Sequence, residues 1–128
     1  MAARAWVDAA DDDFCYLTTR GRVTGTPHEI EIWFALDGST LYLLSGGRDR
    51  SDWVRNLIAD PAVTVRLRDV TLPATARVLE PGTDPSGIWE DAHARRIVFD
   101  KYQPRSGGLE GWRESALPVA LHVAETAL

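Results

Sequence analysis

The chain has 128 residues, 45% of them hydrophobic, and its 14 basic and 19 acidic side chains give a formal net charge of −5. These values predict one globular domain, residues 1–128, that buries roughly two thirds of its unfolded surface. The acidic balance argues against a nucleic-acid binder, because phosphate contacts need a basic excess on one face. We find neither a signal-peptide core nor an apolar run of about 18 residues, so we expect no transmembrane segment and a cytoplasmic protein.

The first part of the chain combines an acidic run with a strand. Asp11, Asp12 and Asp13 are adjacent. Such a run is typical of a solvated cap or tail, and we predict no metal site, which would need ligands converging from elsewhere. Cys15 lies in an apparent strand and has no second cysteine to pair with. A packed thiol is therefore favoured over a reactive one.

Alternating apolar residues predict the next strands. One strand runs from Glu29 to Leu36, with one face formed by Ile30, Ile32, Phe34 and Leu36 and the other by Glu29, Glu31 and Trp33. A hairpin turn at 37–40 leads into a strand at 41–45. Helical spacing follows over 51–59 and ends before Pro61. Strands are expected again at 63–67 and 74–80, with a turn near Asp69 between them.

The C-terminal part predicts a long helix at about 84–101, with Asp84 as N-cap and Pro85 at the first helical position. Its apolar stripe would be formed by Ile88, Ala92, Phe99 and Tyr102. Arg95 interrupts this stripe, so we expect its stem along the core edge and its charge in water or paired to a carboxylate. A helical turn near 109–115 and a last strand at 117–123 complete the chain.

Six strands with intervening helices indicate a mainly β, α+β fold. The strands follow one another too closely for parallel crossovers, so a closed or split antiparallel barrel is favoured over a doubly wound sheet.

The stretch 18–34, TTRGRVTGTPHEIEIWF, suits an anion. Gly21 and Gly25 let the backbone approach a phosphate, and Arg20 and Arg22 can pair with it bidentately. A hairpin loop with solvated arginines is the alternative. A second cluster at 45–57, SGGRDRSDWVRNL, adds Arg48 and Arg50 before a helix N-terminus, where anions bind favourably. Two such loops in one acidic protein favour a phosphate-containing ligand.

These segments, together with WVRNLIADPAVTVRL and the late KYQP and GWRESALPVALHV, resemble the deazaflavin (F420)-dependent nitroreductase and quinone reductase family of actinobacteria. The resemblance implies a six-stranded antiparallel split β-barrel of the flavin-reductase and pyridoxamine-phosphate-oxidase type. It also implies the coenzyme F420, with FMN as the alternative. Where members of the nitroreductase branch commonly have a lysine before the glycines and a proline before the tryptophan, this chain has SGGRDRSDW.

The resemblance assigns cofactor binding to two loops. The phosphate turn falls on Arg20, Gly21, Arg22 and Gly25, and the closing loop and helix fall on Ser45, Gly46, Gly47, Arg48, Trp53 and Asn56. Trp112 would line the substrate pocket. Tyr102 is the candidate catalytic residue, as a proton donor, with a packed and hydrogen-bonded tyrosine as the alternative.

The function implied is hydride transfer from reduced F420 to a quinone, nitroaromatic or other conjugated acceptor, since the coenzyme supplies the chemistry. The alternatives are an FMN-dependent reductase and a non-catalytic split barrel that carries a cofactor or apolar ligand. The expected partner is a small redox substrate. FMN-type relatives are usually homodimers, whereas members of the nitroreductase branch often function without forming a dimer. The resemblance therefore leaves a homodimer possible and the oligomeric state open.

Overall fold

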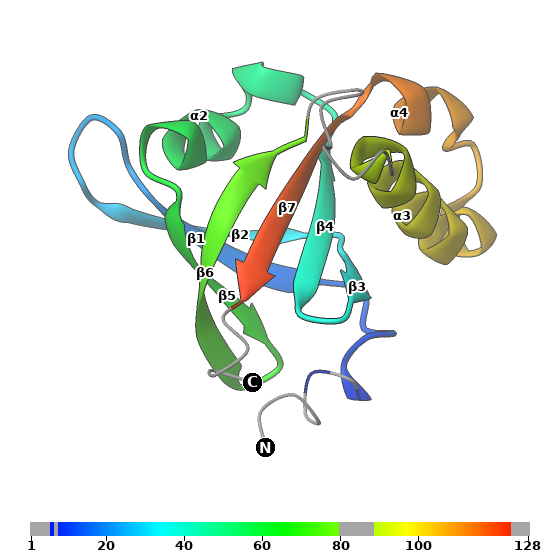
Figure 1. Cartoon of the computed structure of the whole chain (residues 1–128), viewed down its shortest axis with the longest axis horizontal. Coiled ribbons are helices and arrows are strands. Elements are labelled where there is room, and N and C mark those ends of the chain that lie inside the picture. The colour runs from blue at the N-terminus through cyan, green and yellow to red at the C-terminus, as the bar shows by residue number, and fades with distance from the viewer. Residues whose placement is uncertain (1–5, 7, 80–88, 124–128) are drawn as a thin grey trace.

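The computed structural model describes residues 6, 8–79 and 89–123, and its centre is one antiparallel sheet (Figure 1). The strands are β1 (Cys15–Arg20), β2 (Pro27–Ile32), β3 (Ala35–Asp37), β4 (Thr40–Ser45), β5 (Ala62–Leu67), β6 (Val70–Val78) and β7 (Leu117–Val123). Their order in the sheet is β2-β1-β5-β6-β7-β4-β3. The two end strands are consecutive in the chain, so the sheet curls on itself as a split barrel.

The described residues hold seven strands rather than the predicted six, because the expected strand from Glu29 to Leu36 is interrupted at Trp33 and Phe34. Before the break the chain pairs with β1, and after it the chain pairs with β4. At the break, the Phe34 N–H donates to the Tyr102 hydroxyl, which also contacts the Phe34 carbonyl oxygen, each at 3.0 Å. This side chain replaces the missing strand partner of a buried backbone.

Two hydrophobic clusters lie on the two faces of the curled sheet. The inner cluster contains the inward residues of the strands, among them Leu17, Phe34, Val65 and Leu121. Ile30, Ile32 and Leu36 pack against it, as the alternation predicted. The outer cluster contains Tyr42 and Leu44 with side chains of the C-terminal helices. Strand β4 is buried on both faces, which explains its nearly continuous apolar sequence.

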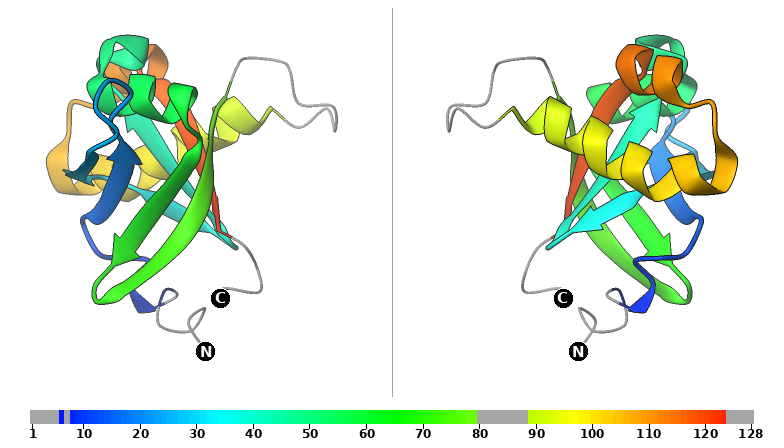
Figure 2. Two further views of the ribbon diagram at one scale, coloured as in Figure 1. Left: turned by 90° about the vertical axis from the view of Figure 1, so that its left-hand side faces the viewer. Right: turned by 90° about the vertical axis from the view of Figure 1, so that its right-hand side faces the viewer.

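The short helix η1 (Arg48–Arg50) and α2 (Asp52–Ala59) follow β4, while α3 (Glu90–Ser106) and α4 (Glu110–Ser115) precede β7. Figure 2 shows α3 lying across the outer face of the sheet, where it contacts β3, β4 and β7. No helix within residues 6, 8–79 and 89–123 combines the length and apolarity needed to cross a bilayer.

Helix α3 differs from its prediction. The expected cap at Asp84 and Pro85 and the first stripe residue Ile88 lie outside the described residues. The buried stripe is Ala94, Val98 and Tyr102, at a regular spacing of four, whereas Ala92 is exposed. The predicted stripe was wrong at Ala92. Its members are unevenly spaced, so they placed the apolar face on a different side of the helix from the one that is buried.

Arg95 also differs from the expectation of a solvated or carboxylate-paired charge. Its Nη1 donates to the carbonyl oxygens of Arg113, Glu114 and Ala116 at 2.6, 3.0 and 2.7 Å. These are terminal carbonyls of α4, which have no partner within that helix. Arg95 therefore joins α3 to the C-terminal end of α4.

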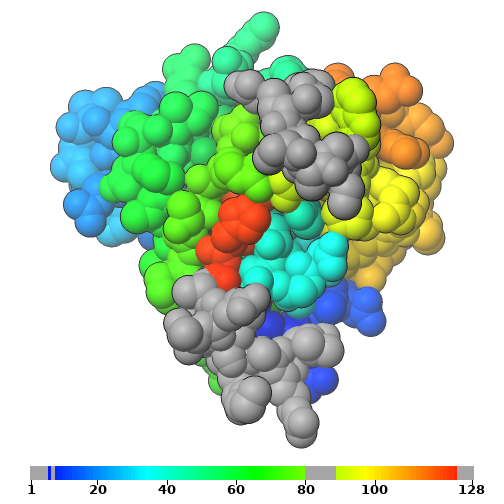
Figure 3. All heavy atoms as spheres, in the orientation of Figure 1, coloured from blue at the N-terminus to red at the C-terminus, as the bar shows by residue number. Residues whose placement is uncertain are grey.

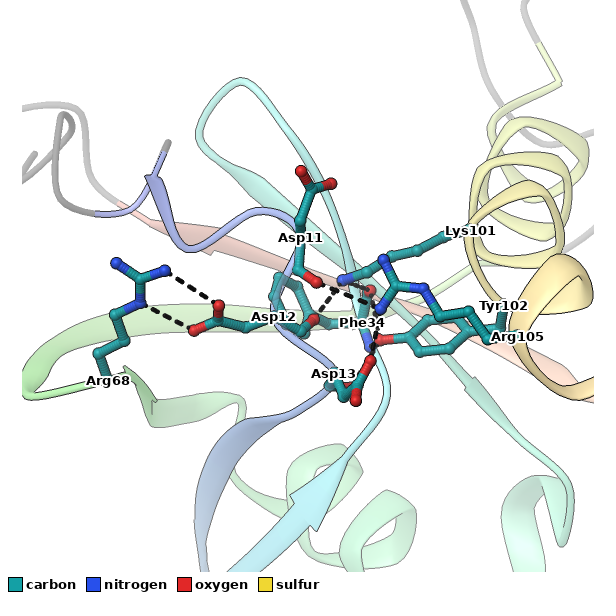
Figure 4. A network of polar contacts seen from close by, with 8 residues as sticks. All are labelled: Asp11, Asp12, Asp13, Phe34, Arg68, Lys101, Tyr102 and Arg105. Atoms are coloured by element: carbon teal, nitrogen blue, oxygen red, sulfur yellow. Dashed lines mark hydrogen bonds and ion pairs between the residues drawn. The ribbon is translucent and has the colours of Figure 1, made fainter.

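Asp11 and Asp13 of the acidic run are exposed, as expected of a solvated cap, but the run also fastens the N-terminal segment to the barrel (Figure 4). Asp12 forms a bidentate pair with Arg68, at 2.9 and 3.1 Å, and Asp13 pairs with Arg105 of α3. The Arg68 hydrogen bond holds the pKa of Asp12 below its usual range. Lys101 of α3 donates to the carbonyl oxygens of Asp12 and Phe34, at 2.7 and 2.9 Å.

Cys15 is fully buried, which confirms a packed thiol. Burial raises the pKa of this thiol to about 12. The side chain therefore stays protonated near neutral pH and acts as a small apolar group.

Candidate functional site

The turn between β1 and β2 is built on glycine. The Gly21 N–H donates to the Thr26 carbonyl and the Gly25 N–H donates to the Gly21 carbonyl, both at 2.8 Å. Gly25 has a φ of +76°, which favours glycine. A Cβ on Gly21 would lie 2.9 Å from His28 Nε2 and 3.0 Å from the Thr26 oxygen, so only glycine fits there.

Arg22 leaves this turn and reaches α2, far along the chain. Its backbone N–H and its Nη1 both donate to Asn56 Oδ1, at 3.2 and 2.8 Å, and its Nη2 pairs with Asp52 Oδ1 at 3.2 Å. Asn56 is buried and its amide donates to Thr19 Oγ1 at 3.2 Å. This chain of bonds fixes the guanidinium between the hairpin and the helix, which lie side by side in Figure 3.

A cavity of about 510 Å³ opens at this junction and is called the arginine pocket. Its lining combines the hairpin turn, the start of β2 and the first turns of α2, with Gly21, Arg22, His28, Glu29, Ile30, Asp52, Trp53 and Asn56 among its residues. Arg22 uses two of the five guanidinium N–H donors on Asn56 and Asp52. The remaining N–H groups and the N-terminal end of α2 give this pocket anion-binding capacity.

A second cavity, of about 470 Å³, is called the aromatic pocket. It is lined by Phe14, Glu31, Ile32, Trp33, Leu44, Leu109 and Trp112. Trp33 stacks on Tyr102 with ring centroids 4.3 Å apart and meets Trp112 edge-on at 5.8 Å. At its rim Glu31 accepts a hydrogen bond of 2.8 Å from the Tyr16 hydroxyl, which raises the pKa of Tyr16.

The two pockets are adjacent along β2. Glu29 and Ile30 line the arginine pocket, and the next two residues, Glu31 and Ile32, line the aromatic pocket. One strand therefore borders both the cavity that holds Arg22 and the apolar cavity lined by aromatic side chains. A ligand with an anionic end and a planar end would match this sequence of surfaces.

The end of β4 and the loop after it, residues 45–51, pack against α2 and α4. Ser45 is buried, and its hydroxyl donates to the Arg48 carbonyl and contacts Ser51 Oγ, both at 3.0 Å. A Cβ on Gly46 would lie 3.4 Å from Trp112 Nε1, and one on Gly47 only 2.5 Å from Ser51 Oγ. The two glycines thus let this loop pack closely between α2 and α4.

The structure brings only part of the predicted site together. Gly21, Arg22, Trp53 and Asn56 line the arginine pocket, and Trp112 lines the aromatic one. Arg20 points away to Asp60, 3.7 Å distant, and Arg48 bonds the Ser115 carbonyl and lines a third cavity, of about 540 Å³, beside Asp49 and Leu57.

Tyr102 is 1% exposed, and its hydroxyl donates to the Asp13 carbonyl at 2.7 Å. Burial raises its pKa, with the hydrogen bond to Phe34 acting in the opposite direction. This placement favours the packed alternative over a proton donor.

Several lining residues escaped the sequence prediction. Trp33 was placed on a polar face with Glu29 and Glu31, and Asp52 and His28 were not included among the site residues. The signal for Asp52 was present, since it lies in the first turn of the predicted helix beside Trp53. The signal for Trp33 was absent, because the strand break that turns it under α3 depends on the distant Tyr102 hydroxyl.

The curled antiparallel sheet with helices on its outer face is a split-barrel fold of the pyridoxamine-phosphate-oxidase-like type. A putative pyridoxamine 5'-phosphate oxidase from Listeria innocua is similar in structure, with 19% identity over 98% of this chain and 95% of that chain and a TM-score of 0.66. An F420-H2-dependent reductase (FDR-A) is similar at 23% identity over 88% and 95% of the two chains, with a TM-score of 0.64. A structure described as a domain-swapped dimer gives 21% identity over 88% and 81%, with a TM-score of 0.67.

The family model for F420H(2)-dependent quinone reductases matches residues 7–110, and the chain belongs to that family. It is therefore an oxidoreductase of the F420-dependent class.

The residues present fit this cofactor. Arg22 offers free N–H donors in the arginine pocket, beside the N-terminal end of α2. The aromatic pocket offers flat walls to a planar ring.

Proposed function

We propose that this chain is a reductase that binds F420H2 along β2 and passes its hydride to a quinone, nitroaromatic or other conjugated acceptor held in the aromatic pocket. The phosphate end of the coenzyme would lie in the arginine pocket against Gly21, Arg22 and the start of α2. The observation that carries the proposal is the adjacency of the two pockets on consecutive residues of β2.

The reduced coenzyme supplies the hydride when bound. The side chains of the protein therefore need only bind and orient the coenzyme and the acceptor and exclude water. Arg22 would hold the phosphate, and Asn56 would hold Arg22 in place. Trp33 and Trp112 would form the wall of the aromatic pocket, which the deazaflavin ring and the acceptor would share. An apolar wall favours flat, conjugated acceptors and leaves little room for water once they lie against it.

Tyr102 has a positioning role in this proposal. It stacks on Trp33, at an interplanar angle of 4°, and its hydroxyl joins the strand break to the N-terminal segment. Gly46 gives Trp112 room at the other side of the pocket. The remaining predicted residues, Arg20, Gly25, Ser45, Gly47 and Arg48, would shape the two loops rather than touch the ligand.

The proposal also covers the organisation of the protein. The whole chain would act as one split-barrel domain, and its partner would be a small redox substrate. A homodimer is consistent with the domain-swapped dimer among the similar structures. Sedimentation at several protein concentrations tests this state.

The function is tested by titrating the protein separately with F420 and with FMN, following quenching of tryptophan fluorescence, and then measuring F420H2 oxidation by a soluble quinone. Trp53 in the arginine pocket and Trp33 and Trp112 in the aromatic pocket supply the signal. We expect tight F420 binding and turnover. Binding without turnover with any acceptor would favour a carrier, and stoichiometric FMN binding without F420 binding would overturn the proposal.

A further inference from the structure

The charges around the arginine pocket do not form the basic patch that an extended anionic ligand requires. Arg22 is paired with Asp52, and Glu29 lies 3.9 Å from Arg66 Nη2. Among the described lining residues there is one guanidinium, Arg22, and two carboxylates, Asp52 and Glu29. The pocket can therefore bind one phosphate through Arg22 but offers little attraction to further negative charge.

Asp52 is the carboxylate closest to the anion-binding donors. Its Oδ1 lies 3.2 Å from Arg22 Nη2, and its side chain is 84% exposed at the pocket rim. An anion that approaches the free N–H groups of Arg22 meets this carboxylate on the neighbouring nitrogen. Like charges at such separations disfavour one another, although water and salt weaken the effect at an exposed site.

Asp52 is not needed to hold Arg22 in position. The guanidinium and the backbone N–H of Arg22 are both fixed by Asn56, which is 4% exposed and bonded in turn to Thr19. Removing the charge of Asp52 would leave this buried anchor in place. The carboxylate then acts on a bound anion mainly through its charge.

We propose that Asp52 is a specificity-determining residue that limits how much negative charge the arginine pocket accepts. It lets the chain bind the phosphate of F420 while gaining little from the negatively charged polyglutamate tail that this coenzyme carries. This inference rests on the proposed function, because it concerns the same pocket and the same coenzyme.

The test compares Asp52→Asn with the wild type by fluorescence titration with F420 carrying a short or a long polyglutamate tail. Asp49→Asn is the matched control, since it makes the same charge change next to the third cavity. We expect wild-type Kd values for the two tails within about twofold. Asp52→Asn should tighten binding about threefold to fivefold at low salt, and Asp49→Asn should change it by less than about 1.5-fold.

Three results would overturn the inference: unchanged or weaker binding by Asp52→Asn, an equal gain in Asp49→Asn, or a wild-type preference of about tenfold or more for the longer tail. These results differ from failure of the proposed function. In that case the wild type would bind neither form of F420, and no comparison of variants would be needed to see it.

Discussion

Arg20 and Arg22 flank the same glycine, yet they face different neighbours. Arg20 is largely exposed and turned to Asp60, whereas Arg22 lines the arginine pocket. Arg22→Ala should therefore weaken F420 binding by about 1.5–3 kcal/mol, the contribution of hydrogen bonds to a charged group. Arg20→Ala, the matched control, should change it by less than about 0.5 kcal/mol. Isothermal titration measures both affinities. Equal losses in the two variants would contradict the assignment of Arg22 as the phosphate-binding arginine.

The anchoring of Arg22 also affects stability. Asn56 Oδ1 is buried and accepts from both the backbone N–H and Nη1 of Arg22, so Arg22→Ala leaves it only the longer bond from the backbone. We expect the free energy of unfolding to fall by about 1–2 kcal/mol, the cost of a poorly satisfied buried acceptor. Arg20→Ala should leave it unchanged. Urea unfolding of the two variants tests this, and identical midpoints would contradict the buried anchor.

Lys101 should make the free energy of unfolding depend on pH. Burial, and next the charge of Arg105, lower its pKa from 10.5 to about 8. Between these two values the unfolded chain keeps a proton that the folded chain has lost, so the contribution of Lys101 to the free energy of unfolding increases as pH rises from about 8 to 10.5. The free energy of unfolding of the wild type minus that of Lys101→Met should increase across this window. A difference that stays flat in urea unfolding from pH 7 to 10.5 would contradict the lowered pKa.

At the level of elements, Arg95 joins α3 to the end of α4 by three bonds to carbonyl oxygens. Arg95→Met keeps much of the apolar stem but leaves these acceptors without their donor, so we expect a loss of about 1–3 kcal/mol in the free energy of unfolding. Arg96→Met on the same helix is the control, because Arg96 is exposed and its carboxylate pair with Asp100 contributes little. Chemical unfolding measures both, and equal losses would contradict the role of Arg95.

The predicted strands and helices were correct where one local pattern determined them. The inward residues Val63, Val65 and Leu67 all belong to the inner cluster, as alternation predicted. The break at Phe34 was not predictable, because it is stabilised by Tyr102, 68 positions later in the chain. The stripe of α3 failed for a related reason: Ala92 and Ala94 are the same residue type, and only packing on the sheet distinguishes them.

In the candidate site, too, features set by neighbouring residues were predictable and features set by distant residues were not. Gly21 and Gly25 were correctly assigned to a tight turn, since the backbone requires them there. The direction of each arginine depends on partners elsewhere in the sequence: Asp60 for Arg20, Asn56 for Arg22 and Ser115 for Arg48. These three arginines of the two loops therefore do not converge on one site.

At the scale of the whole molecule, the proposed function requires one ligand to lie across both pockets of β2. The most direct measurement is a crystal structure of the protein with F420 bound, together with the Kd for F420 of the wild type. We predict the phosphate at Arg22 and Gly21 and the deazaflavin ring facing Trp33 and Trp112. Coenzyme bound in the third cavity beside Arg48, or no binding of F420 at all, would contradict the proposed function.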